Sequence, residues 1–168
     1  MHEVPAAGIL VDDKYGRSSL HKASDHDIWI GRPIEVSGNY PLKLQNEEDL
    51  TSFLNEWPVN HCVKVLAPVR IDDSEEIKKR YEEKLQNLFR ACRNTSHEFL
   101  LEIITGFKNK KTEPKQILEL INRFYSIGIF PDWWKIEPIE DKEFWKSTGN
   151  LIRSFDPFVH GIVVLGND

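Results

Sequence analysis

Six short apolar runs, separated by longer amphipathic stretches, constrain the fold of this chain more than any other feature of its sequence. The runs are rich in β-branched and aromatic residues and have the length of buried strands. They cover residues 7–11, 28–36, 62–67, 99–104, 133–136 and 161–165. Runs that are apolar on both faces indicate a parallel sheet covered by helices, so we expect an α/β protein.

The stretches between the runs show helical periodicity. The clearest covers residues 74–93, where Ser74 is a candidate N-cap and apolar residues recur every three or four positions. Further helices are expected over residues 47–57, 114–127 and 141–155. Gly128 follows one of them directly, as a helix C-terminus favours.

Alternating strands and helices of this kind are typical of a (β/α)₈ barrel of the TIM-barrel type. Such a barrel needs eight strands and usually about 250 residues. This chain has 168 residues and about six strand-like runs. We therefore expect a single domain over residues 1–168 that forms an incomplete barrel.

Composition excludes several classes of protein. The formal net charge of −5 disfavours a nucleic-acid surface, and no apolar run approaches the roughly 20 residues that span a bilayer. The N-terminus lacks the pattern of a signal peptide, and Cys62 and Cys92 are far apart, as expected of core thiols in a reducing compartment. No phosphate-binding glycine motif is present. We expect a cytoplasmic protein without a cofactor and without a nucleic-acid or membrane partner.

Ionisable residues lie inside or just after four of the apolar runs. Lys64, Glu102 and Lys135 lie within runs, whereas Asp12 and Glu137 follow the first and the fifth. A charge in a buried strand is costly unless it is paired or functional. Because the C-terminal ends of barrel strands meet at one mouth, we expect these groups to converge there. Two interpretations stay open, a buried ion-pair network and a catalytic site.

The chemistry that such a site suits is the reaction of a lysine with a carbonyl. A lysine amine is nucleophilic only in its neutral form, which burial or a neighbouring cation favours. The iminium that it forms with a ketone is an electron sink, so a carbon–carbon bond beside it can break. A carboxylate such as Glu102 would move the proton of the departing hydroxyl.

Other ionisable clusters have weaker patterns. His21 and His26 lie among acidic residues, but without a tetrahedral set of ligands a solvated helix end is favoured over a metal site. His61 and His160 begin strands, at the end of a barrel opposite its usual site, so we expect structural roles. Residues 108–111 (KNKK) would form a solvated loop or attract a phosphate. No metal site is expected.

Five segments in a fixed order carry a resemblance that covers nearly the whole chain. They are residues 7–16 (AGILVDDKYG), 63–66 (VKVL), 99–103 (FLLEI), 128–137 (GIFPDWWKIE) and 161–166 (GIVVLG). Together they resemble the DUF2090 domain, the aldolase-like C-terminal part of bacterial 5-dehydro-2-deoxygluconokinases of inositol catabolism. More distantly they are similar to class I tagatose-1,6-bisphosphate aldolases and sulfofructose-phosphate aldolases. By this resemblance the chain covers the second to seventh barrel strands and lacks the first and eighth.

The resemblance implies roles for individual residues. Lys135 aligns with the Schiff-base lysine, and Lys64, Glu102 and Asp12 align with the other catalytic positions. Glu137 and Gly166 are candidate substrate-binding residues. The implied reaction is cleavage of 6-phospho-5-dehydro-2-deoxygluconate, a phosphorylated sugar acid, to dihydroxyacetone phosphate and malonate semialdehyde.

A second class of function stays open beside the lyase. The chain would then be a non-catalytic remnant or accessory domain of a sugar-acid kinase or aldolase. A kinase domain is a possible partner under either hypothesis. Because an open sheet exposes two strand edges, we also expect a homo-oligomer.

Overall fold

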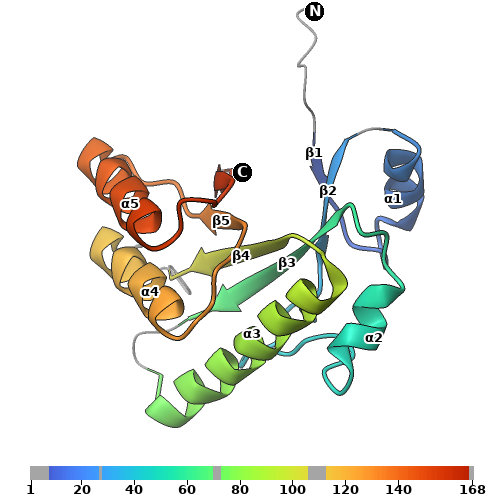
Figure 1. The fold of residues 1–168 in the computed structure, drawn as a ribbon, viewed down its shortest axis with the longest axis horizontal. Coiled ribbons are helices and arrows are strands. Elements are labelled where there is room, and N and C mark those ends of the chain that lie inside the picture. Colours follow the sequence, from blue (N-terminus) through green and yellow to red (C-terminus); the bar gives the residue numbers. More distant parts are fainter. Residues whose placement is uncertain (1–7, 27, 70–72, 106–112, 167–168) are drawn as a thin grey trace, which may run out of the picture.

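The computed structural model describes residues 8–26, 28–69, 73–105 and 113–166, and it contains one parallel sheet of six strands in sequence order (Figure 1). The strands are β1 (Gly8–Leu10), β2 (Trp29–Pro33), β3 (His61–Pro68), β4 (Phe99–Ile104), β5 (Trp133–Ile136) and β6 (Gly161–Val164). All five neighbouring pairs are parallel. The six predicted strands and the α/β class are therefore confirmed. The basic segment 108–111 lies outside the described residues.

In the described part of the chain, five helices connect the strands. They are α1 (Arg17–Ser24), α2 (Leu50–Asn55), α3 (Glu75–Thr95), α4 (Pro114–Ser126) and α5 (Lys142–Phe155). Four of them match predicted helices, although α2 is shorter than the periodicity over residues 47–57 indicated. The helix α1 was not among the predicted ones, because only Leu20 and Ala23 are buried along it.

Local sequence fixes where these helices start and stop. The side chain of Ser74 accepts a hydrogen bond from the N–H of Ile77 at the start of α3, as its N-cap pattern predicts. Asp141 accepts from the N–H groups of Glu143 and Phe144 at the start of α5. After α4 the chain turns at Gly128 with φ of 84°, a left-handed conformation that favours glycine.

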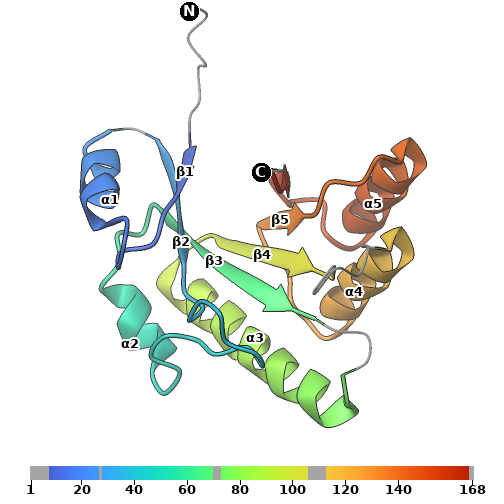
Figure 2. The same cartoon turned by 180° about the vertical axis from the view of Figure 1, so that it is seen from behind.

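The sheet curls into a half-barrel with the helices on its convex side (Figures 1 and 2). Alternate strand residues face those helices and form the main core. They include Val63, Val65, Leu101, Ile103, Trp134 and Ile136, all fully buried. The two tryptophans of β5 point to opposite faces, because Trp134 contacts Phe124 and Tyr125 of α4 whereas Trp133 contacts Trp29 of β2. The intervening residues of each strand therefore line the concave side.

Candidate functional site

A row of four alternating charges lies on the concave side of the half-barrel. The Nζ atom of Lys135 lies 2.8 Å from Oε1 of Glu102, and Oε2 of Glu102 lies 2.7 Å from Nζ of Lys64. Lys64 also contacts Oε1 of Glu35, at 2.5 Å. We call Glu35, Lys64, Glu102 and Lys135 the charge row. The structure thus brings together three of the residues that the sequence pattern selected, and it adds a fourth.

Strand register explains why these side chains meet. Glu102 of β4 lies directly opposite Lys135 of β5. Lys64 of β3 lies opposite Leu100, one inward-facing position before Glu102, so its long side chain reaches forward to the carboxylate. The residues on either side of Lys64, Glu102 and Lys135 face the helices, where they are buried in the core. A shift of one residue in any strand would turn its charge into that core, so the hydrophobic pattern holds the register.

Glu35 was missed by the sequence analysis. It follows β2 and shares a face with Trp29, Gly31 and Pro33, as a count by twos along the strand would have shown. The glycine and the proline interrupt that run, so the alternation is hard to recognise. Glu35 therefore obeys the same rule as the other members of the charge row.

The charge row is largely buried, and its charges are balanced. The side chains of Glu102 and Lys64 are buried, at 4% and 7% exposed, and those of Glu35 and Lys135 are partly buried, at 12% and 13%. Two carboxylates and two ammonium groups alternate, so every charge has an opposite neighbour. Such pairing offsets the large cost of removing ions from water. The balance also lets a proton pass between Lys135 and Glu102 without leaving a net charge behind on this pair.

Lys135 forms part of the wall of an apolar cavity. The cavity has a volume of about 420 Å³ and lies on the concave side between β1 and β2 on one flank and β5 and β6 on the other. Its other lining residues are Gly8, Ile9, Leu10, Trp29, Leu100, Trp133 and Val163. Lys64 has two carboxylate partners, whereas Glu102 is the carboxylate partner of Lys135 among the described residues. Lys135, an amine with one carboxylate partner beside an apolar cavity, is therefore a better candidate nucleophile than Lys64, which is held by two carboxylates.

The remaining predicted site residues lie outside the charge row. Oδ1 of Asp12 accepts hydrogen bonds from the N–H groups of Lys14 and Tyr15, which forms a turn before α1. Oε2 of Glu137 accepts from the N–H and the hydroxyl of Thr105, which ties the ends of β4 and β5 together. Gly166 is exposed, and a Cβ atom added there would meet no atom of the described residues within 4 Å apart from its neighbours in the chain.

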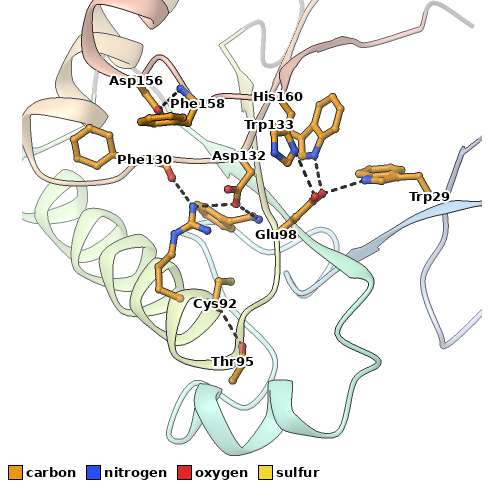
Figure 3. A network of polar contacts seen from close by, with 12 residues as sticks. Trp29, Cys92, Thr95, Glu98, Phe130, Asp132, Trp133, Asp156, Phe158 and His160 are labelled. Atoms are coloured by element: carbon orange, nitrogen blue, oxygen red, sulfur yellow. Dashed lines mark hydrogen bonds and ion pairs between the residues drawn. The ribbon is translucent and has the colours of Figure 1, made fainter.

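The opposite end of the concave side is closed by a cluster around Glu98 (Figure 3). Its Oε2 accepts hydrogen bonds from the indole N–H groups of Trp133, at 2.8 Å, and Trp29, at 3.4 Å. Its Oε1 lies 3.4 Å from Nδ1 of His160. Because β2 and β5 are not neighbours in the sheet, the two indoles bridge the half-barrel and form a floor below the cavity. His160 also packs edge-on against Trp133, with the ring centroids 5.2 Å apart.

Two histidines are buried beneath the convex face at the same end of the sheet. His61 starts β3 and His97 precedes β4, and each is 2% exposed. Nε2 of His61 lies 3.4 Å from the hydroxyl of Ser24, and Nδ1 of His97 lies 2.8 Å from that of Thr95. Burial lowers the pKa of both imidazoles, and the Arg32 cation lowers it further.

These histidines predict a dependence of stability on pH. The unfolded chain takes up protons at their ordinary pKa of 6.5, whereas the native chain does so only at lower pH. The free energy of unfolding should therefore rise with pH up to about 6.5 and then level off. Urea unfolding near pH 5.5 and 7.5 measures this difference. The difference in free energy of unfolding between the two pH values should be smaller in the variant His61→Gln/His97→Gln. It should be unchanged in His21→Gln, which alters an exposed residue. An equal difference in all three proteins would contradict the assignment.

Other features of the described chain support no separate site. Cys62 and Cys92 are buried, and burial raises the pKa of both thiols, so neither is a reactive nucleophile. Within the described residues no cluster of histidine, cysteine and carboxylate side chains has the arrangement of a metal site. No helix in that part of the chain is both long and apolar enough to cross a membrane.

Fold and site together define an α/β half-barrel with a buried lysine–glutamate site on the concave side of its sheet. The chain belongs to the family described as "Uncharacterized protein conserved in bacteria (DUF2090)", whose model matches residues 2–168. This match confirms the family to which the five segments pointed. No curated protein matches the chain.

Proposed function

We propose that this protein is a class I aldolase-type carbon–carbon lyase of inositol catabolism. Its substrate would be 6-phospho-5-dehydro-2-deoxygluconate, and its products dihydroxyacetone phosphate and malonate semialdehyde. The observation that carries the proposal is the placement of the Lys135 amine, 2.8 Å from Glu102 and beside an apolar cavity. Nucleophile and proton acceptor are thus adjacent before any substrate binds.

The proposed reaction starts when Lys135 gives a proton to Glu102 and its neutral amine attacks the C5 ketone. Glu102 returns that proton to the hydroxyl of the carbinolamine, which leaves as water and gives an iminium. Glu102 then accepts the proton of the C3 hydroxyl, and the C3–C4 bond breaks. Its electron pair moves to the iminium to form an enamine, and malonate semialdehyde leaves. Protonation of the enamine carbon and hydrolysis by water release dihydroxyacetone phosphate and restore the lysine.

The remaining site residues have supporting roles in this proposal. Lys64, held between Glu35 and Glu102, would tune the reacting amine or contact the substrate. Asp12 and Glu137 would bind substrate hydroxyls at the C-terminal ends of their strands. The open space around Gly166 leaves room for the phosphate.

Trapping with a reductant tests the proposal. The protein is incubated with dihydroxyacetone phosphate and sodium cyanoborohydride, and its peptides are then mapped by mass spectrometry. We expect one covalent adduct, on Lys135. Absence of any adduct on folded protein would instead favour a non-catalytic accessory domain. The specific observation behind that alternative is that the charge row satisfies its own charges, as a purely structural network would.

Self-association is expected from the open edges of the sheet. Leu10 at the β1 edge is 40% exposed and Val164 at the β6 edge is 50% exposed, and exposed apolar strand edges promote pairing between chains. Sedimentation velocity should therefore show a homo-oligomer. The variant Leu10→Lys/Val164→Lys should shift it towards monomer, whereas Val59→Lys, on the loop before β3, should not. A wild-type protein that sediments as a monomer would refute this prediction.

A further inference from the structure

Glu35 occupies a rigid position at the mouth of the half-barrel. The N–H of Ile34 donates to the carbonyl of Lys64, and that of Gln45 donates to the carbonyl of Ile34. The N–H of Val36 donates to the carbonyl of Lys43. These hydrogen bonds hold the backbone on both sides of Glu35, which also forms a bridge with Leu44. The backbone that carries the carboxylate is therefore held in place, and Lys64 holds its Oε1, as a binding group requires.

One oxygen of this carboxylate has no partner among the described residues. Oε1 of Glu35 binds Lys64, but Oε2 is buried and receives no hydrogen bond from any described residue. A carboxylate oxygen loses its hydrogen bonds to water when it is buried, and its burial is unfavourable unless a donor of the protein or of a ligand replaces them. Buried oxygens without a donor are rare in native proteins. Both oxygens of Glu102, by contrast, are bound to lysines. Within the charge row of the described chain, Oε2 of Glu35 is thus the one carboxylate oxygen left for a donor from a ligand.

The two ends of the charge row carry different functional groups. At one end the amine of Lys135 is placed to react with a carbonyl, and at the other end the Glu35 oxygen is placed to accept a hydrogen bond. A ligand that satisfies both ends carries a carbonyl and a hydroxyl. The two groups lie close together, because inward-facing side chains of β2 and β5 meet across the half-barrel, as Trp29 and Trp133 do. A plain ketone would leave the Glu35 oxygen unsatisfied.

We propose that Glu35 is a further substrate-binding residue, whose Oε2 accepts the hydroxyl on the carbon next to the reacting carbonyl. The site then selects α-hydroxy ketones over ketones that lack this hydroxyl. This inference rests on the proposed function for the position of the carbonyl. The selection itself is a property of binding, so it is measured separately from catalysis.

A pair of ligands that differ by this one hydroxyl tests the inference. Dihydroxyacetone phosphate carries it, and 1-deoxy-dihydroxyacetone phosphate (acetol phosphate) does not. Calorimetry gives the Kd of each for the wild type, for Glu35→Gln, which removes the charged acceptor, and for Glu143→Gln, which alters an exposed carboxylate. We expect the wild type and Glu143→Gln to prefer the hydroxylated ligand. In Glu35→Gln this preference should fall about tenfold or more, as for loss of a hydrogen bond to a charged group.

Each other outcome has a defined meaning. An unchanged preference in Glu35→Gln overturns the inference, as does loss of binding of both ligands by a folded variant, since Glu35 would then act through Lys64. If Glu35→Gln does not fold, Glu35→Asp keeps the charge but withdraws the oxygen, and its preference must fall too. Trapping is run in parallel. A wild type that binds with the hydroxyl preference but forms no adduct refutes the lyase and retains the Glu35 site, whereas one that binds neither ligand refutes both.

Discussion

Replacement of Lys135 with methionine is expected to abolish the covalent adduct with dihydroxyacetone phosphate and cyanoborohydride. Methionine has nearly the length of the lysine side chain and can line the same apolar cavity, but it has no amine to attack the ketone. The loss should be complete, because no iminium forms without that nitrogen. Intact-protein mass spectrometry measures the adduct, and thermal unfolding verifies that the variant is folded.

Two further variants make this result specific. Lys64→Met removes the other buried lysine, and its adduct on Lys135 should persist, although more slowly because a neighbouring cation is lost. Lys79→Met alters an exposed lysine of α3 and should behave as the wild type. An adduct that survives in Lys135→Met and is absent in Lys64→Met would move the nucleophile to β3. It would also reverse the roles that the resemblance implies.

The sequence was sufficient to select three members of the charge row, for a simple physical reason. In a strand buried on both faces, nearly every residue is apolar, so Lys64, Glu102 and Lys135 stand out and their parity can be counted. Six parallel strands then bring their C-terminal halves together. The parallel order was also predictable, because four of the five connections between strands contain a predicted helix long enough to cross the sheet.

The features that escaped prediction depend on contacts distant in sequence or on irregular backbone. Glu35 follows a glycine and a proline that disrupt the alternation, and its partner Lys64 lies 29 positions away. The turn after β1, in which the carboxylate of Asp12 accepts hydrogen bonds from two backbone N–H groups, is irregular backbone of this kind. The floor formed by Glu98 and the two indoles requires knowledge of how strongly the sheet curls. Whether a residue has an odd or an even position along its strand predicts the face of the sheet on which its side chain lies. It does not predict how far that side chain reaches across the half-barrel.

Replacement of Glu102 with glutamine is expected to destabilise the protein strongly. Glu102 is the carboxylate shared by the two lysines of the charge row. The variant leaves Lys135 buried without an ionic partner among the described residues, while Lys64 retains Glu35. Loss of one partner from a buried ion pair costs about 3–5 kcal/mol. Urea denaturation measures the free energy of unfolding, and Glu143→Gln, which breaks an exposed pair with Lys146, should change it by less than about 1 kcal/mol.

A variant with four substitutions separates two contributions to the free energy of unfolding. One is the loss caused by leaving part of the charge row unpaired, and the other is the contribution of the intact charge row. In Glu35→Gln/Lys64→Leu/Glu102→Leu/Lys135→Met no buried side-chain charge of the row remains. Because replacing a whole buried ion network by apolar residues is often neutral or stabilising, most of the stability lost in Glu102→Gln should return. Such a recovery would show that the fold does not need these four charges, which favours a role in chemistry. If the fourfold variant were as unstable as Glu102→Gln, the charge row would be a structural network, and the lyase proposal would lose its main support.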